Sequence, residues 1–482
     1  MRSSLPLLGL ATAFATVSNA HTLFTTLFIN DENQGDGTCV RMPMDGNTAT
    51  GPIADPFNNG DVACGRDGDK AVAFTCPAPA GAKLTFTFRE YPDASKPGVI
   101  DKLHKGPVAV YLRRVSSFSS SPSGGGWFKI WHEGYDDAQG KFATEKLIAD
   151  KGLLSVNLPP RLPTGNYLVR TELIALHNVT ENPVKVHPQF YPGCAQLFIQ
   201  GDGDGDLNIP ADRQASIPGH VSPDEPGLNF DFYNDKGPYT TPGVDIYFPG
   251  AGTSPKAKVV VPLSASQGGI PEDCLIKNAN WCGYEVESYT DETGCWNAVT
   301  ACYKQGDVCY KSSPPTGSKN CDAWDRAKCD KIRDSCDAGD FTGPPNKGVK
   351  LLEQFLGNSE PPAPRNPGVV AGPSVEIPRP APSSASANAP VVETTAPEPE
   401  PTSTTVSVPE HAESEVAAPT SAADHDTTTT ATTTVVATTT VTITGVQHGL
   451  TTGTVQGVYV PTSTECARLG RGKRVRGHPR RG

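Results

Sequence analysis

The 482-residue chain has few apolar residues and lacks an excess of positive charge. Hydrophobic residues make up 37% of it, beside 46 Pro and 48 Gly, so much of the chain is expected to be loop or to lack a packed core. Beyond the first 20 residues, no apolar run approaches the length of about 20 residues that a membrane-spanning helix needs. We therefore expect no transmembrane segment. The net charge of −11 argues against general nucleic-acid binding.

Residues 1–20 have the pattern of a secretory signal peptide. Arg2 precedes the apolar run Leu5–Val17, and small residues lead up to His21. We expect a secreted, extracellular protein that starts at His21, and the thirteen cysteines fit an oxidising compartment. A terminal histidine offers its α-amine and its ring Nδ1 to one metal ion. Taken alone, the pattern leaves open that His21 is simply the residue at which cleavage falls.

Residues 21–252 predict an all-β domain, an immunoglobulin-like or fibronectin-like β-sandwich with long loops. Short β-branched and aromatic runs alternate there with Gly, Pro, Asn and Asp clusters. The run at 83–89 alternates with period two, as a strand with one buried face does. The strands are expected at Leu23–Ile29, Lys83–Tyr91, Val108–Val115, Leu154–Leu158, Tyr167–Leu176, Leu197–Ile199 and Val244–Phe248.

Residues 273–342 form a second unit with eight cysteines, after a linker at 253–272. Cys295, Cys302 and Cys309 are seven residues apart, and so are Cys329 and Cys336, with Cys321 eight before Cys329. Seven residues is about two helical turns, and the segment 313–317 between the two groups can reverse the chain. The spacing predicts a small, disulfide-rich helical hairpin, and another disulfide knot of similar size is the alternative. The expected pairs are Cys295–Cys336, Cys302–Cys329, Cys309–Cys321 and Cys274–Cys282.

Residues 343–482 are dominated by Pro, Ser, Thr, Ala and Val. This composition predicts a disordered, Ser/Thr/Pro-rich tail with O-linked glycans, because aromatic residues for a core are scarce. The basic end, Arg468 to Arg481, is interpreted as solvated, and association with an anionic cell wall or membrane surface is the alternative. No apolar segment for a GPI anchor follows it. Cys466 is left over by the odd cysteine count.

Five motifs in order resemble the fungal AA9 lytic polysaccharide monooxygenases, over nearly all of 21–250. A single motif would be weak evidence, whereas five in register are strong. The motifs are His21 after the signal peptide, His104-Lys-Gly-Pro-Val-Ala-Val-Tyr-Leu, Trp127-Phe-Lys-Ile, Tyr167-Leu-Val-Arg-Thr-Glu-Leu-Ile-Ala-Leu-His177 and Gln189-Phe-Tyr191-Pro-Gly-Cys194.

The resemblance implies one copper ion held by the α-amine and ring of His21 and by the ring of His104. Amine and imidazole nitrogens suit copper. Tyr191 corresponds to the family's axial tyrosine, beside the metal. His177 and Gln189 match the pair that orients the oxygen species. The co-substrate would be O₂ or H₂O₂, and an external reductant, a small molecule or a redox protein, would supply electrons.

The resemblance also implies the disulfide Cys64–Cys194, which leaves Cys39 and Cys76 to pair with each other. Two departures from the family pattern affect the outer part of the site. Thr171 stands where the family often has histidine, and the segment 178–188 is longer than usual. Asn178 begins the sequon Asn178-Val-Thr180 and is expected to carry an N-linked glycan.

Other residues complete the set of candidates. Tyr239 falls where the family carries a surface tyrosine that stacks on sugar rings, so we expect it to bind substrate. His132 and His187 match no family role and are expected not to be ligands. Residues 202–206 alternate Asp and Gly, but Arg213 stands where a calcium loop needs an acid, so an acidic turn is favoured over a calcium site.

Together these features predict a secreted, monomeric copper monooxygenase that oxidatively cleaves β-1,4-glucan, in the simplest case cellulose, at C1, C4 or both. The resemblance implies a flat active face, because a crystalline polymer cannot enter a pocket. Two alternatives remain open. One is a copper-binding cell-wall surface protein without oxidative activity, and the other is a non-catalytic polysaccharide-binding protein in which the histidines are incidental.

Overall fold

The computed structural model describes residues 21–181, 184–201, 205–235, 238–252, 261–356 and 360–365. The expected signal peptide, most of the Asp/Gly motif at 202–206, and the tail beyond 365 with Cys466 lie outside these residues. Among the described helices, none combines the length and apolar character required to cross a membrane.

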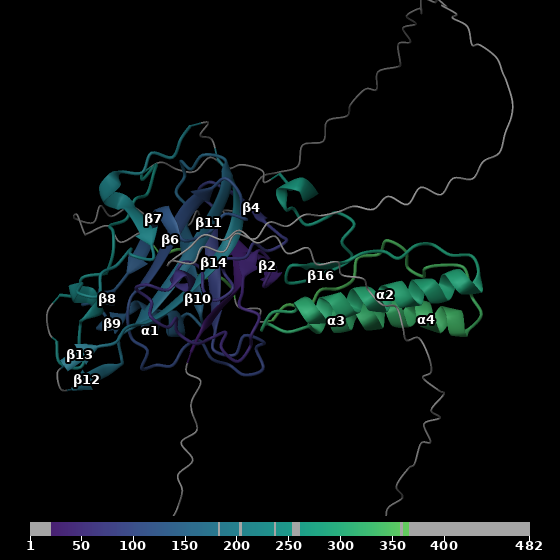
Figure 1. Cartoon of the computed structure of the whole chain (residues 1–482), viewed down its shortest axis with the longest axis horizontal. Coiled ribbons are helices and arrows are strands. Elements are labelled where there is room, and N and C mark those ends of the chain that lie inside the picture. Colours follow the sequence, from purple (N-terminus) through teal and green to yellow (C-terminus); the bar gives the residue numbers. More distant parts are fainter. Residues whose placement is uncertain are drawn as a thin grey trace, which may run out of the picture. The chain divides into compact units, whose positions relative to one another are not determined.

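Two sheets form the predicted β-sandwich (Figure 1). The first has the order β10 (Leu153–Asn157), β5 (Lys83–Arg89), β1 (Leu23–Ile29) and β2 (Glu32–Asp36). The second has the order β15 (Gln214–Ile217), β7 (Gly124–Glu133), β6 (Val108–Val115), β11 (Gly165–Ala175), β14 (Gln189–Gln200) and β3 (Val40–Arg41), and β4 (Cys76–Pro79) runs parallel to β14.

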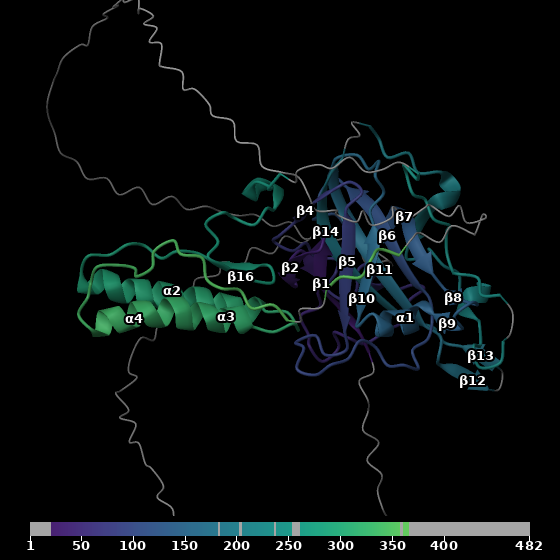
Figure 2. The ribbon, with the colours of Figure 1, turned by 180° about the vertical axis from the view of Figure 1, so that it is seen from behind.

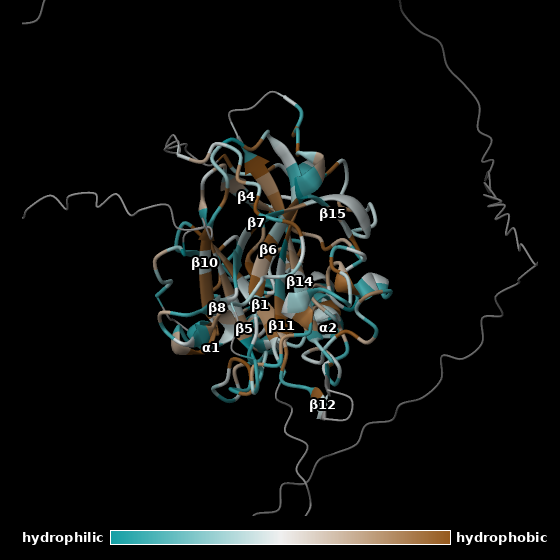
Figure 3. Ribbon diagram, turned by 90° about the vertical axis from the view of Figure 1, so that its left-hand side faces the viewer, coloured by the Kyte–Doolittle hydropathy of each residue, from teal (hydrophilic) through white to brown (hydrophobic). Residues whose placement is uncertain are grey.

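Strand β6 shows how the sandwich buries both faces of its second sheet. Alternate residues point to opposite faces, so Val110 and Leu112 join the core between the sheets, while Tyr111 joins a second apolar cluster on the outer face. The second cluster contains Leu228 and other residues of the long loops. In Figure 3, strands such as β6 and β10 are largely hydrophobic, and the loops around them are more hydrophilic. The loops are thus held in place by packing against the sheet.

Strand β5 is buried more completely than its alternating pattern predicts. Leu84 and Phe86 face the core, but Thr85 on the opposite face is also fully buried. The hydroxyls of Thr85 and Ser155 are hydrogen-bonded at 2.7 Å, and the Ser155 carbonyl accepts from the Arg365 amide at 2.8 Å. The polar face of this sheet is therefore covered by the chain itself.

The Cys-rich unit is the predicted helical hairpin. Helix α2 (Glu292–Ser312) runs alongside α3 (Lys319–Trp324), a π-helical turn η5 (Asp325–Cys329) and α4 (Asp330–Asp337), as both views show (Figures 1 and 2). A short β16–β17 pair (Ile276–Asn278 and Trp281–Gly283) precedes it. The structure contains the disulfides Cys295–Cys336, Cys302–Cys329, Cys309–Cys321, Cys274–Cys282, Cys39–Cys76 and Cys64–Cys194, the same six pairs as expected.

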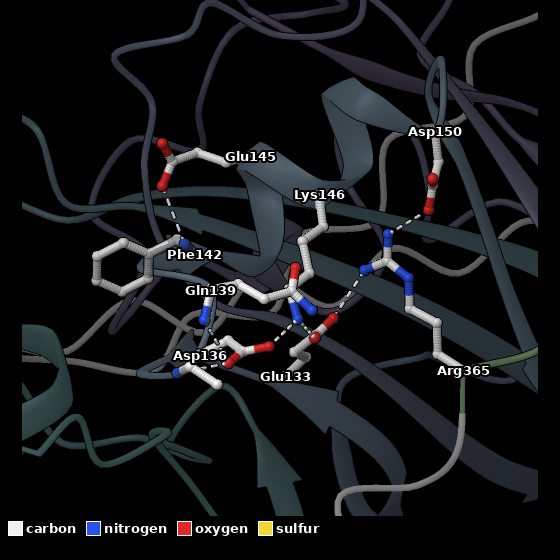
Figure 4. Close-up of polar contacts among 9 residues, drawn as sticks. Glu133, Asp136, Gln139, Phe142, Glu145, Lys146, Asp150 and Arg365 are labelled. Atoms are coloured by element: carbon white, nitrogen blue, oxygen red, sulfur yellow. Dashed lines mark hydrogen bonds and ion pairs between the residues drawn. The ribbon is translucent and has the colours of Figure 1, made fainter.

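Residues 350–356 and 360–365, here called the C-terminal strap, pack on the folded part although the expected tail begins at 343. The Leu356 amide donates to Asp36 at 2.8 Å. The Arg365 guanidinium donates to Glu133 and Asp150, each at 2.7 Å (Figure 4). Lys146 joins this charged group through Glu133 and Asp136, each at 2.6 Å. These specific partners hold the strap despite its Pro-rich composition.

Three further differences concern element boundaries. The expected strand Val244–Phe248 is wrong, because only Ile246 forms a bridge, to Lys129. The long strand β7 was not expected, because its glycines at 124–126 resemble a loop. Part of the expected linker also packs on the sandwich, where the Gly268 carbonyl accepts from the Thr75 amide at 2.8 Å.

Smaller elements lie near the loops. They are η1 (Gly60–Val62), α1 (Ala143–Ala149), η2 (Ala211–Arg213), η3 (Pro226–Leu228), η4 (Ala265–Gln267), the pair β8 (Tyr135–Asp136) and β9 (Lys141–Phe142), and the pair β12 (Val179–Glu181) and β13 (Val184–Val186).

Candidate active site

Three parts of the sandwich bring the expected site residues together. His21 precedes β1, and the next residue, Thr22, is held by a 3.1 Å hydrogen bond from its amide to the Thr50 carbonyl. His104 ends a turn before β6, with its amide 2.9 Å from the Asp101 carbonyl. Tyr191 comes from β14, opposite Leu173 of β11. The two central strands of the second sheet thus carry one side of the site.

The backbone next to His104 leaves no room for a side chain. A Cβ added to Gly106 would lie 1.9 Å from the Ile174 carbonyl oxygen, and the Gly106 amide donates to Thr144 Oγ1 at 3.0 Å. Glycine permits this close approach of two backbones. The approach fixes the loop that carries His104 against β11, whose end leads to His177.

The rings of four expected site residues form one contiguous group. The centroids of His21 and His104 are 6.0 Å apart and their planes are nearly perpendicular, at 88°. Tyr191 lies 6.1 Å from each of them. His177 lies 4.0 Å from His104 with 33° between the planes. The structure therefore brings together residues that are up to 170 positions apart in the sequence (191 − 21).

The histidines of this group have buried ring nitrogens that are suited to binding. Among the described residues, no hydrogen-bond partner reaches Nδ1 or Nε2 of His104, or Nδ1 of His177. Burial, together with the neighbouring His177, lowers the pKa of His104 to about 4. Burial also lowers the pKa of His177. Both rings are thus neutral near pH 7 and keep a lone pair, which is the form that binds a metal.

Tyr191 and Gln189 are joined by a hydrogen bond. The Tyr191 hydroxyl donates to Gln189 Oε1 at 2.7 Å, and the ring is almost fully buried. Burial raises the pKa of Tyr191, so the hydroxyl keeps its proton. Because the Gln189 carbonyl accepts this bond, its amide NH₂ is the end that can donate to another group.

Charge near His21 comes from two side chains of opposite sign. Burial lowers the pKa of His21, the positive charge of Arg66 lowers it further, and Glu90 opposes this. Arg66 is itself fixed by three loop carbonyls, those of Thr48 and Gly51 at 3.1 and 2.8 Å and that of Pro52 at 2.6 Å. Arg66 therefore orders the loop beside His21 and favours a neutral imidazole there.

Comparisons with known proteins identify the same family as the sequence motifs. Residues 21–241 match the model of Auxiliary Activity family 9, formerly GH61. The chain is 45% identical over 350 residues to AA9 family lytic polysaccharide monooxygenase C of Aspergillus tamarii, covering 70% of this chain and 91% of that protein. The chain belongs to family AA9. Members of this family are copper-dependent, secreted enzymes that act oxidatively on polysaccharides with an external reductant.

Other matches extend beyond the family segment. AA9 family lytic polysaccharide monooxygenase H of Botryotinia fuckeliana is 47% identical over 355 residues, which is 72% of this chain and 79% of that protein. These matches are longer than the 221 residues of 21–241 (241 − 21 + 1), so the relatives share sequence outside it. The solved structure of CvAA9A is 34% identical and covers 47% of this chain and 98% of its own, with a TM-score of 0.42.

The donor set of this AA9 chain fits copper. Among the described residues, no group of three or more His, Cys, Asp or Glu side chains is arranged to hold a metal ion. The side chains therefore supply only two nitrogen ligands, the imidazoles of His21 and His104. The α-amine of His21, which cleavage after Ala20 would free, would be the third nitrogen. Three neutral nitrogen donors suit copper better than hard, oxygen-preferring cations.

The unusually long segment 178–188 of this AA9 chain forms a small hairpin beside the site. Strands β12 and β13 pair with Val179 opposite Val186, and Val186 is buried in the outer apolar cluster. Asn178 is exposed at the start of this hairpin, where a glycan would reach solvent. Thr171, at the other departure, is buried in β11, with its hydroxyl 3.4 Å from the Gly193 carbonyl.

Tyr239 is half-buried in its Pro-rich loop. Its hydroxyl donates to the Gly227 carbonyl at 2.9 Å. Its ring packs edge-on against Phe142 and Phe230, at 5.2 and 5.3 Å. These contacts hold the Pro-rich loop in place and leave part of the ring exposed, so substrate stacking on Tyr239 stays a prediction.

Neither of the two expected non-ligands belongs to the ring group. The ring contacts that join His21, His104, His177 and Tyr191 do not include His132 or His187. His132 Nδ1 instead lies 3.2 Å from Lys129 Nζ, and His187 is exposed on the surface.

A buried charged group beneath the site was not expected from the sequence. Glu172 Oε1 accepts hydrogen bonds from the guanidinium of Arg170 and from His220, the latter at 2.9 Å. Arg170 also donates to the carbonyls of Val62 and Ala63, at 2.8 and 2.9 Å. This group anchors the loop that carries Cys64, which is joined through its disulfide to Cys194 in the middle of β14. The sequence signal was two opposite charges two positions apart in a strand, which places both on one face.

Proposed function

We propose that this AA9 chain is a secreted copper-dependent lytic polysaccharide monooxygenase that cleaves β-1,4-glucan, with cellulose as its substrate, at C1, C4 or both. The observation that carries the proposal is the pairing of two nearly perpendicular imidazoles, His21 and His104, 6.0 Å apart at the N-terminal edge of the sandwich. The ring nitrogens of His104 have no protein partner among the described residues, which supports a role as ligand.

His21 and His104 would hold the metal from two sides. The loop that carries His104 is fixed by the close backbone approach at Gly106, and the backbone of His21 is placed directly before the inner strand β1. When bound, copper supplies one-electron redox chemistry with O₂ or H₂O₂, which allows a C–H bond of the sugar to be oxidised. Both ligand rings are kept neutral by burial, so no proton has to leave them when the metal binds.

Three further residues would control protons and hydrogen bonds beside the metal. Tyr191 is held protonated by burial, and its hydroxyl is directed to Gln189 Oε1. The Gln189 amide can then donate a hydrogen bond to a small oxygen co-substrate. His177 stacks against His104 and can exchange a proton at a ring nitrogen, because its depressed pKa keeps it neutral and able to accept one.

The substrate-facing surface would be formed by exposed loop residues near His104. Leu103 is 52% exposed and directly precedes His104. Lys105 lies over the ring of Phe232 at 5.7 Å, and Phe232 stacks on Tyr233, which is 58% exposed, at 4.2 Å. We propose that Tyr233 provides a further sugar-stacking ring, in addition to Tyr239.

The test is product analysis with the mature, copper-loaded protein. Incubation with cellulose and ascorbate should release aldonic acids, C4-oxidised ketoaldoses or both, detected by mass spectrometry. His104→Ala should lose bound copper and all oxidised products, while the control His187→Ala, at an exposed position outside the ring group, should match the parent. Copper bound tightly without oxidised products would instead favour the cell-wall copper-binding alternative, and oxidised products from His104→Ala would refute the assigned site.

A further inference from the structure

Helix α2 of the Cys-rich hairpin carries three aromatic residues at a seven-residue spacing. Trp296, Tyr303 and Tyr310 each directly follow one of the cysteines that face α3, η5 and α4. At 3.6 residues per turn, each aromatic residue is about 100° around the helix from its cysteine, and successive ones are about 10 Å apart along the axis. The three side chains therefore form a row along one side of α2, here called the aromatic row.

The ends of the aromatic row are open to solvent. Trp296 is 38% exposed and Tyr310 is 39% exposed, although large aromatic side chains usually bury most of their surface. Tyr303, in the middle, packs partly against the hairpin core. The disulfide-bonded core of the hairpin thus leaves the two ends of the aromatic row exposed on the surface.

Polar side chains of the opposite helical segments line the aromatic row and fix its tyrosines. The Tyr303 hydroxyl donates to Asp330 and accepts from Arg333 at 2.9 Å. The Tyr310 hydroxyl lies 2.7 Å from Asp322 and 3.2 Å from Asp325. The two tyrosine rings are therefore held in place before any ligand arrives, which reduces the entropy lost on binding.

We propose that the aromatic row is a second polysaccharide-binding site that takes an extended β-1,4-linked glucan chain. The spacing of its rings along α2 is close to the length of two sugar units in such a chain, so alternate sugars would present the same face to successive rings. Sugar C–H faces stack on aromatic rings, and the neighbouring carboxylates and guanidinium can accept from and donate to sugar hydroxyls.

The composition of this surface favours a sugar polymer over a protein partner. Protein-binding patches have an apolar centre depleted of charge. Here the rings alternate with Thr300 and Asp307 on the same side of α2, and four charged residues of the facing segments lie beside them. A polar, linear surface with evenly spaced rings matches a linear, hydroxyl-rich ligand. The proposal rests on the polysaccharide substrate of the family, but it does not require copper.

The experiment measures binding of the full, metal-free chain to microcrystalline cellulose by depletion from solution. Removal of copper by EDTA separates this test from the oxidative reaction. Trp296→Ala with Tyr310→Ala should weaken binding by about tenfold, since one aromatic contact contributes a severalfold change in affinity. Tyr284→Ala is the matched control, because this tyrosine is also 38% exposed. Its backbone is hydrogen-bonded to the side chain of Gln305, which projects from α2 about half a turn around the helix from the aromatic row.

Each outcome decides for or against the proposal. Weaker cellulose binding of the double variant, with an unchanged midpoint of thermal unfolding and unchanged binding of Tyr284→Ala, supports it. If the double variant unfolds early, the single change Trp296→Ala at the open end of the row is used, and about threefold weaker binding is expected. Equal binding of parent and variant, or equally strong binding of the parent to helical, α-linked starch, would overturn it. Loss of oxidised products with intact cellulose binding would overturn the proposed function alone.

Discussion

The ring of His177 lies against the ring of His104, with 4.0 Å between the centroids and 33° between the planes. A proposed metal ligand thus shares a face with a histidine that is not a proposed ligand. The two have separable roles, because no group of three His, Cys, Asp or Glu side chains among the described residues could hold a metal ion, so His177 does not join His21 and His104 as a third ligand.

Replacing His177 or Gln189 by alanine should reduce oxidation without removing the metal. Residues that surround a metal site typically contribute about 10- to 100-fold to activity or metal affinity. We expect each variant to retain copper after desalting, measured by elemental analysis, and to release oxidised sugars about 10- to 100-fold more slowly. Loss of copper from His177→Ala would instead identify His177 as a ligand.

Replacing Glu172 by glutamine should destabilise the sandwich strongly. Burial opposes the charge of Glu172, but Arg170 and His220 outweigh it and lower the pKa of this carboxyl. The uncharged amide would leave the fully buried Arg170 without a counter-charge, at a cost of about 3–5 kcal/mol in the free energy of unfolding. Denaturant unfolding with intact disulfides measures it. Glu32→Gln, at an exposed edge strand, is the control and should be nearly neutral.

Acidification should weaken the fold through His132. Burial and the nearby Lys129 lower its pKa from 6.5 to about 4, so the unfolded chain takes up a proton first as the pH falls. The stabilisation by neutral His132 is present above about pH 6.5 and is lost towards pH 4, amounting to about 1–3 kcal/mol for this side chain. His132→Gln should show a smaller loss of unfolding free energy over this window. An identical pH profile would contradict the prediction.

Replacing Arg365 by alanine should loosen the C-terminal strap without unfolding the sandwich. The ion pairs to Glu133 and Asp150 are partly buried (Figure 4), with 15% of the Arg365 side chain exposed, and each contributes about 1 kcal/mol. We expect faster hydrogen exchange in the peptide that spans 353–365 and a nearly unchanged unfolding midpoint. Arg365→Lys keeps the charge but not the forked geometry. Its hydrogen-exchange rate should therefore lie between that of the parent and that of Arg365→Ala. Unchanged exchange in the alanine variant would show that the strap is held elsewhere.

The sequence predicted those elements of the fold that are determined by residues close together in the chain. The cysteines of α2, and Cys329 with Cys336, are spaced at two helical turns, so their facing stripes follow from helix geometry. The eight-residue step from Cys321 to Cys329 is taken up by the π-helical turn η5. Strands such as β1 and β6 are runs of β-branched, aromatic and other apolar residues, and both were expected with the bounds that the structure has. The site residues were recognised because five motifs keep their order, which composition alone would not reveal.

Long-range packing accounts for what the sequence did not reveal. Tyr239 packs against Phe142, 97 positions earlier (239 − 142), and no local pattern indicates that contact. Glu172 meets His220 across 48 positions, and Arg365 meets Glu133 across 232. Each of these contacts forms only when distant segments are brought together by the sandwich, so short-range periodicity does not predict them.

In α2 the cross-linked side and the aromatic side follow the same seven-residue count. A single inserted residue between Cys302 and Cys309 would turn everything after it by about 100°, separating Cys309 from Cys321 and moving Tyr310 out of line with Trp296 in one step. Within regular α-helix, only additions of two turns keep both sides of α2 in line. The facing segment has an eight-residue step from Cys321 to Cys329 and takes up its extra residue in the π-helical turn η5.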